Sequence, residues 1–140
     1  MRADRMFSVV LACVLAVGPV AAGLRPAMAE VNDISVGGVW AFKITHDAAG
    51  YSAGDRVVEV TKRITEVLST PKFRTGGAVV AVHPLGNAAE ILVGDRLVIT
   101  VVPDDAAGTG VTTLELAHQW AQRLAQGLSK ALPDANFHMF

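Results

Sequence analysis

The amino-acid sequence predicts an α+β fold, a two-layer sandwich in which two amphipathic helices cover one face of an antiparallel sheet. Two segments repeat apolar residues at the spacing of a helix face, and each has an apolar stripe rather than an apolar circumference. Before and between them lie short apolar runs, rich in valine and separated by glycine turns typical of hairpins. The predicted order is ββαβββα, which favours one core between a sheet and a helical layer.

The first two strands are expected at residues 34–36 and 39–44. Gly37-Gly38 separates them, and two consecutive glycines readily adopt the positive φ that a tight hairpin requires. The chain therefore begins its folded part, expected at about residues 34–132, with a hairpin.

A helix is expected after the turn-rich stretch HDAAGYSAGDR. Ser52 is its predicted N-cap, and Asp55 three residues later favours the positive end of the helix. Glu59 precedes Arg63 by four residues, the favourable order for an ion pair, and the helix ends near Pro71. Its apolar face is predicted to contain Val57, Val60, Ile64, Val67 and Leu68.

Three further strands are expected at residues 78–84, 90–93 and 96–102. Gly94-Asp95 connects the last two directly and is typical of a tight hairpin. Pro103 lacks the N–H that would continue a ladder, so the last of these strands ends there.

The closing helix is expected to begin with a capping box of Thr112 and Glu115 and to run to about Leu132. We expect the indole of Trp120 to pack against the sheet as a core residue. The apolar stripe of the helix is predicted to contain Leu114, Ala117, Ala121, Leu124 and Leu128, flanked by Leu116 and Trp120.

Residues 1–29 are typical of a secretory signal peptide. Arg2 and Arg5 precede the apolar stretch 6–17, Gly18-Pro19 interrupts it, and Ala27-Met28-Ala29 has the small-residue pattern of a cleavage site. The mature chain, residues 30–140, is expected to form a single domain in the periplasm.

Two alternatives to a cleaved signal peptide concern the same segment. Met6 to Leu24 is free of charge and long enough to serve as a retained membrane anchor. A lipoprotein signal at Cys13 is less consistent with an apolar run that continues beyond that cysteine. A mature chain beginning at Glu30 contains no cysteine, so its stability would not depend on disulfides.

The charge of residues 30–140 argues against a nucleic-acid partner. These residues contain nine basic and twelve acidic side chains, without basic clusters. The aromatic residues are few and scattered, unlike the stacking platforms that bind single strands.

The adjacent acids Asp104 and Asp105 follow the last strand of the hairpin. Neighbouring residues on an extended chain point in opposite directions, and the following residues do not supply the alternating oxygen ligands of a calcium loop. We therefore expect both acids to mark the exit from the strand, with neither acting as a catalytic acid or metal ligand. The Asp105 carboxylate is expected to accept hydrogen bonds from N–H groups of its own turn. Its replacement by alanine would then lower the free energy of unfolding by about 1 kcal/mol.

The histidines suggest no metal or catalytic site. Glu115 and His118 have the Glu-x-x-His spacing of di-iron bundles, but no second copy of that motif occurs, so His118 is expected on the polar side of its helix. His46, His83 and His138 have no ligand spacing between them.

Motifs for nucleophilic catalysis and phosphate binding are also missing. No serine lies in a G-x-S-x-G elbow. The sequence alone does not exclude a catalytic triad assembled from residues that are distant in the chain. Gly108-Thr109-Gly110 precedes a helix and is more typical of a flexible connection than of an anion site. We expect no catalytic residue, no cofactor and no metal.

An ordered set of residues resembles a known periplasmic domain. The stretches VWAFKI, YSAGDR, ILVGDRLVITV and LELAHQWAQRL are similar to the domain that precedes the membrane helices in some bacterial small-conductance mechanosensitive channel proteins, over most of residues 34–132. Residues 30–140 contain nothing typical of pore helices, so the resemblance implies a free-standing version of a non-catalytic domain. The positions that carry it are Ser52, Arg56, Gly94, Asp95, Arg96, Thr100, Asp105, Ala106, Leu116, Ala117, Trp120 and Ala121.

Three functions are consistent with the sequence. The first is a secreted periplasmic binding or regulatory module that docks on an envelope protein, such as a mechanosensitive channel, or captures a small ligand. The second is a small periplasmic hydrolase whose site forms only in the fold, and the third is a membrane-anchored accessory subunit. The seven positions expected to serve structure or interaction are Ser52, Arg56, Asp95, Arg96, Thr100, Asp105 and Trp120.

Overall fold

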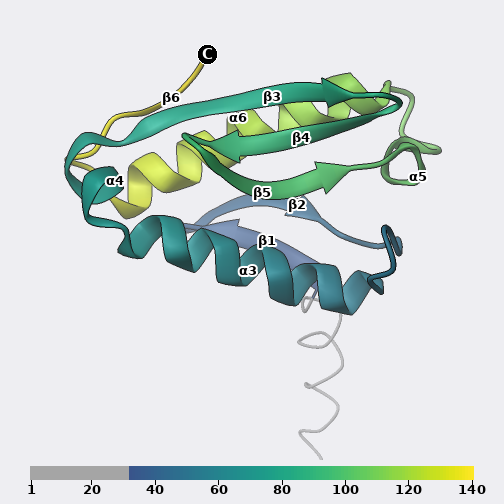
Figure 1. The fold of residues 1–140 in the computed structure, drawn as a ribbon, viewed down its shortest axis with the longest axis horizontal. Helices are drawn as coiled ribbons and strands as arrows, with labels where there is room; N and C mark the ends of the chain where they lie inside the picture. Colours follow the sequence, from purple (N-terminus) through teal and green to yellow (C-terminus); the bar gives the residue numbers. More distant parts are fainter. Residues whose placement is uncertain (1–31) are drawn as a thin grey trace, which may run out of the picture. The chain divides into compact units, whose positions relative to one another are not determined.

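A computed structural model describes residues 32–140, and the predicted signal peptide, its cleavage site and Glu30 lie outside this range. The fold is α+β, as predicted, and combines antiparallel strands with two long helices (Figure 1). Its elements are β1 (Asp33–Val36), β2 (Val39–Lys43), α3 (Ala53–Ser69), α4 (Pro71–Gly76), β3 (Ala78–Leu85), β4 (Ala88–Val93), β5 (Arg96–Val101), α5 (Pro103–Ala106), α6 (Thr113–Ala131) and β6 (Phe137–Met139).

The strands form two sheets rather than the single sheet that the order of elements suggested. Strands β1 and β2 form an antiparallel hairpin, in which Val36 pairs with Val39 across Gly37-Gly38. The other sheet has the order β5-β4-β3-β6, with β6 parallel to β3 and the remaining pairs antiparallel. The consequence is that β5 is an edge strand of the larger sheet.

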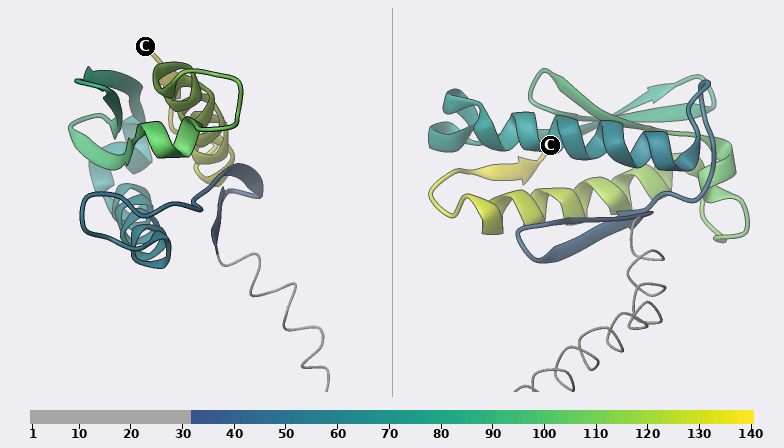
Figure 2. Two further views of the ribbon diagram at one scale, coloured as in Figure 1. Left: turned by 90° about the vertical axis from the view of Figure 1, so that its right-hand side faces the viewer. Right: turned by 90° about the horizontal axis from the view of Figure 1, so that it is seen from below.

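Helix α6 contacts every strand of both sheets, whereas α3 runs beside β5 and β1, one edge strand of each sheet (Figures 1 and 2). An edge strand presents backbone groups that have no strand partner. Helix α3 therefore covers backbone that would otherwise be free, and its polar side chains along β5 build the site described below.

The apolar core lies around α6. Trp120 is buried, with 6% of its surface exposed, and its ring stacks on Phe42 of β2 with centroids 4.5 Å apart and planes at 9°. This confirms Trp120 as a core residue, although its aromatic partner belongs to the hairpin. The second tryptophan, Trp40, is about half exposed and lies under the guanidinium of Arg123, 5.1 Å from its ring centroid.

Gly127 explains how closely the hairpin approaches α6. A Cβ at this position would lie 2.6 Å from the carbonyl oxygen of Val36, closer than side-chain atoms pack. Only glycine permits the two backbones to meet there, which places the β1–β2 turn directly on the helix.

The caps that the sequence predicts are present. Ser52 Oγ accepts from Asp55 N at 3.1 Å, and Thr112 Oγ1 accepts from Glu115 N at 3.1 Å while Glu115 Oε1 accepts from Thr112 N at 3.2 Å. Leu114 corrects the predicted stripe of the last helix, because its side chain is exposed in the first turn while Leu116 is buried. No helix within residues 32–140 is long and apolar enough to cross a membrane.

Candidate functional site

The two adjacent acids have different environments. Asp104 is exposed, whereas the Asp105 side chain is only 2% exposed. Asp105 Oδ1 and Oδ2 accept from Arg56 Nη1 and Nη2 at 3.0 and 2.9 Å, a bidentate ion pair between residues on α5 and α3. The Asp105 carboxylate thus anchors α5 to α3.

Arg56 joins four segments of the chain. Besides Asp105, it donates from Nη1 to His46 O at 2.7 Å and from Nη2 to Thr100 O at 3.0 Å. Asp105 Oδ2 also accepts from Val102 N at 3.0 Å, which is the bond to its own turn that the sequence predicted. Because each charged group is buried among these partners, loss of either would leave the other uncompensated.

Four of the seven predicted positions meet at this end of the molecule. Ser52 begins the helix that carries Arg56, Thr100 supplies a carbonyl, and Asp105 supplies the counter-charge. The segments are distant in the sequence, so the local patterns and the resemblance indicated each residue separately and not the contact between them.

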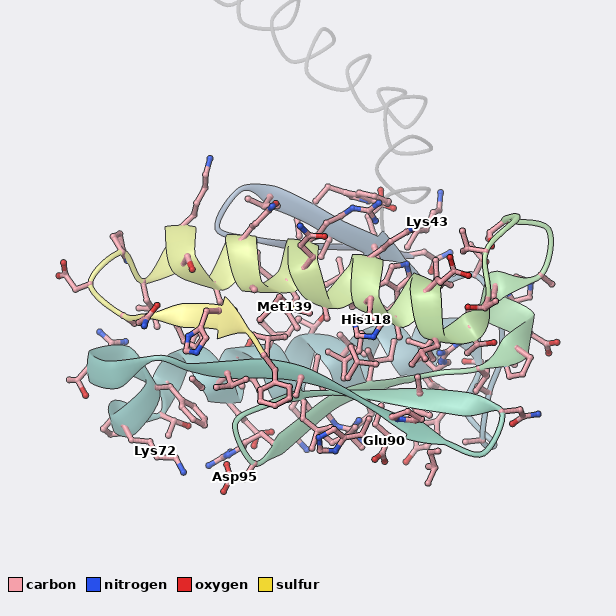
Figure 3. The ribbon with its side chains drawn as sticks, turned by 90° about the horizontal axis from the view of Figure 1, so that it is seen from above. Lys43, Lys72, Glu90, Asp95, His118 and Met139 are labelled. Atoms are coloured by element: carbon pink, nitrogen blue, oxygen red, sulfur yellow. The ribbon has the colours of Figure 1, made fainter. Side chains whose placement is uncertain are left out.

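The other three positions lie elsewhere. Asp95, at the tip of the β4–β5 hairpin, forms an exposed ion pair with Lys72 at 3.6 Å (Figure 3). Arg96 pairs with Glu66 of α3 at 3.5 Å, and Trp120 lies in the core. The seven residues thus do not form one site.

An open groove of about 350 Å³ lies between the first half of α3, strand β5 and the loop that precedes α3. We call it the Tyr51 groove. Tyr51 and Leu85 stand at its surface, 48% and 55% exposed, and its polar side is made of Arg56, Glu59, Arg63 and Thr100. Aliphatic side chains form the rest of the wall: Ala48, Ala49, Val60, Leu85, Leu97, Ile99 and Val102.

Local hydrogen bonds shape the loop on one side of the Tyr51 groove. Ala48 and Tyr51 exchange two backbone bonds of 2.9 Å, which closes a tight turn with Ala49 at a φ of 54°. Asp47 Oδ1 accepts from Ala53 N at 2.9 Å, and the carbonyl of His46 is held by Arg56. The loop is therefore tied at both ends, so this wall of the groove is formed without a ligand.

A second ion pair lies at the polar side of the Tyr51 groove. Glu59 Oε2 is 3.4 Å from Arg63 Nε, as the spacing of the two residues predicts, and both side chains are about one third exposed. Arg63 Nη1 also donates to Val98 O at 3.4 Å. Together with the bond from Arg56 to Thr100, this means that guanidinium groups of α3 bind the carbonyls along the edge of β5 and hinder its pairing with another strand.

The remaining polar candidates form no cluster. Glu115 is occupied by its capping box, and His118 is exposed as expected. Within residues 32–140, the His46 ring has a hydrogen-bond contact with its neighbour Thr45, with Nδ1 and Oγ1 3.0 Å apart, and with no acid or other histidine. Over residues 32–140, no group of three or more histidine, cysteine, aspartate or glutamate side chains is arranged to hold a metal ion.

Sequence reasoning missed the groove and the pairing of Arg56 with Asp105. Tyr51 and Leu85 were the available signals, because they are large apolar side chains in turn regions where no core position was predicted. Arg56 was indicated only by the resemblance, and Asp105 was predicted to bond its own turn but not Arg56.

The comparisons with known proteins identify a family, but the function of that family is unknown. Searches of curated proteins and of solved structures gave no match. The family model described as "Domain of unknown function (DUF8459)" matches residues 33–131, from the start of β1 to the end of α6, and includes every residue of the Tyr51 groove. The chain therefore belongs to the DUF8459 family.

Proposed function

We propose that this protein is a secreted periplasmic binding or regulatory module without catalytic activity, and that the Tyr51 groove is its binding site. The observation that carries the proposal is the groove itself, a mainly aliphatic concavity with a few polar groups on one side. This combination is typical of sites for small molecules, where apolar walls supply affinity and polar groups fix orientation.

The surroundings of the groove support a preformed site. The buried Arg56–Asp105 pair fixes the end of β5 relative to α3, and the tied loop fixes the opposite wall. A ligand that enters a formed site does not have to order the chain, and more of its contact free energy appears as affinity.

A role in the cell envelope rests on the predicted signal peptide of residues 1–29 and on the resemblance to the periplasmic domain of mechanosensitive channel proteins. We propose that an envelope protein, such as a channel of this kind, is the partner that responds to the occupied module. Retention of residues 1–29 would instead make the protein a membrane-anchored accessory subunit.

The acids and histidines give the hydrolase alternative no support. Asp105 is engaged by Arg56 and Val102, and Asp104 is exposed beside it. The Thr45 hydroxyl lies 3.0 Å from His46 Nδ1, but this pair is exposed and neither residue lines the Tyr51 groove, so it places no nucleophile and base in a binding site.

The binding site is tested with N-phenylnaphthylamine, an uncharged dye whose fluorescence rises in apolar surroundings. We expect saturable binding to the wild-type protein and a loss of at least tenfold in affinity for Leu85→Asp, since a charge in an apolar wall is costly to desolvate. Leu85 is 55% exposed, so this variant should keep its fold. Val58→Asp is the matched control, because Val58 is an exposed apolar residue of α3 outside the groove. Equal binding by all three proteins would exclude the groove.

Export is tested by intact mass of the protein recovered from the periplasm. A chain that begins at Glu30 is expected, because cleavage should follow Ala29. Recovery of the uncleaved chain in the membrane fraction would support the anchored alternative and contradict secretion.

A further inference from the structure

The Tyr51 groove continues into a second, polar hollow. A depression of about 220 Å³, which we call the Arg96 depression, is lined by Lys62, Arg63, Arg96, Glu59, Glu66 and Leu97. Three of these residues, Glu59, Arg63 and Leu97, also line the Tyr51 groove, so the two hollows adjoin. They follow the same seam between α3 and β5, which run side by side from Arg56 near Thr100 to Glu66 near Arg96 (Figure 1). The seam thus changes from apolar to charged along its length.

The charged end has an excess of one positive charge. Its lining contains three cations, Lys62, Arg63 and Arg96, and two carboxylates, Glu59 and Glu66. The two ion pairs there are long, with 3.4 Å between Arg63 and Glu59 and 3.5 Å between Arg96 and Glu66. All four side chains are between one third and one half exposed. Ion pairs of this kind are weak in water, so a ligand anion can replace a carboxylate without a large loss.

From this arrangement we propose that the seam binds a single-chain carboxylic acid, with the hydrocarbon tail in the Tyr51 groove and the carboxylate at Arg63 and Arg96. The proposal rests on the proposed function, because it names the ligand of the same groove. A planar guanidinium recognises a carboxylate through two parallel hydrogen bonds, and an ammonium or hydroxyl head offers no such match.

The balance of charge selects a carboxylate over a phosphate head. One carboxylate carries a single negative charge, which neutralises the excess of one in the Arg96 depression. A phosphate monoester carries nearly two, which would leave an uncompensated negative charge beside Glu59 and Glu66. The occupant is therefore a fatty-acid-like molecule and not a phosphorylated lipid.

The test compares dodecanoate, dodecanol, dodecylamine and dodecyl phosphate as competitors of bound N-phenylnaphthylamine, all below the concentration at which they aggregate. The tail is the same in each, so differences report the head group. We expect dodecanoate to bind about tenfold more tightly than the other three at low salt, and the difference to shrink as ionic strength rises.

Two variants locate the head group. Arg63→Gln should weaken binding of dodecanoate much more than binding of dodecanol, and thus remove most of the preference for dodecanoate. Lys130→Gln is the matched control, since Lys130 is an exposed cation on α6 away from the seam, and should leave the preference intact.

The outcomes separate this inference from the proposed function. If the dye binds in the groove but the four competitors displace it equally, or the amine or phosphate displaces it best, the carboxylic acid assignment is overturned while the groove stands. A preference for dodecanoate that survives in Arg63→Gln would also overturn it. If the dye itself does not bind in the groove, the proposed function fails first.

Discussion

Two arginines of α3, two turns apart, differ in almost every physical respect. Arg56 is 6% exposed and makes four hydrogen bonds of 2.7–3.0 Å to a carboxylate and two carbonyls. Arg63 is one third exposed and makes two contacts of 3.4 Å. Both bind the edge of β5, yet only in Arg56 are both terminal nitrogens saturated with hydrogen bonds. The comparison teaches that the end of the seam at Arg56 serves stability, whereas the guanidinium at Arg63 is weakly held and can bind a ligand.

The largest effect is expected at the saturated end. Asp105→Ala should lower the free energy of unfolding by about 4 kcal/mol, because it leaves the Arg56 guanidinium buried without a counter-charge. Denaturant titration followed by circular dichroism measures this. The ion pair thus raises the expected cost above the 1 kcal/mol that a turn bond alone would predict.

Two further variants isolate the cause of that loss. Asp104→Ala, in the exposed neighbour, should leave the midpoint unchanged. The double variant Arg56→Met with Asp105→Leu should recover a large part of the stability, since apolar replacement of both partners removes the uncompensated charge. A double variant as unstable as Asp105→Ala would show that the hydrogen bonds to the carbonyls matter more than the charge.

Trp120→Ala measures how much a residue of the apolar core contributes to stability, for comparison with the loss caused by Asp105→Ala. We expect a loss of about 3 kcal/mol, because the indole is buried and stacked on Phe42. The same denaturant titration applies. If this loss were far below that of Asp105→Ala, the polar anchor and not the core would dominate the stability of the fold.

The N-cap at the saturated end should have an intermediate effect. Ser52→Ala removes the acceptor of the Asp55 N–H and should cost about 1 kcal/mol, whereas Ser52→Asp keeps an acceptor and should cost little. Thermal melts of the two variants decide it. Equal losses would indicate that the hydroxyl has another role in the loop.

The smallest effect on stability is expected at the open end. Arg63→Gln should change the free energy of unfolding by less than about 0.5 kcal/mol, because its ion pair is partly exposed. A loss as large as that of Asp105→Ala in the same denaturant titration would erase the difference between the two arginines.

The sequence predicts well what is encoded within a few residues. The caps Ser52 and Thr112 and the ion pair of Glu59 with Arg63 depend on spacings of three or four, and all three are present. Leu114 fits the helical spacing of the apolar stripe, but it lies in the first turn of α6 and its side chain is exposed.

Contacts between residues that are distant in the sequence could not be predicted from local patterns, for a physical reason. Strand β6 has only three residues, too few for a periodic pattern, and exists because Phe137 pairs with Ala78 of β3. The bond between Arg56 and Asp105 joins residues 49 positions apart, and neither residue type alone indicates burial with a partner. The Tyr51 groove depends on both kinds of contact, so its position could not be predicted from the sequence.

The two tryptophans give the protein two built-in optical reporters. Trp120, buried against Phe42, should emit at shorter wavelengths, and the half-exposed Trp40 should emit at longer wavelengths and be accessible to collisional quenchers. Phe42 belongs to the hairpin and Trp120 to α6, so detachment of the hairpin would expose the indole of Trp120 to water while the strands of the larger sheet are still paired. A red shift of emission that precedes the loss of secondary structure would therefore reveal the hairpin as a separately unfolding unit.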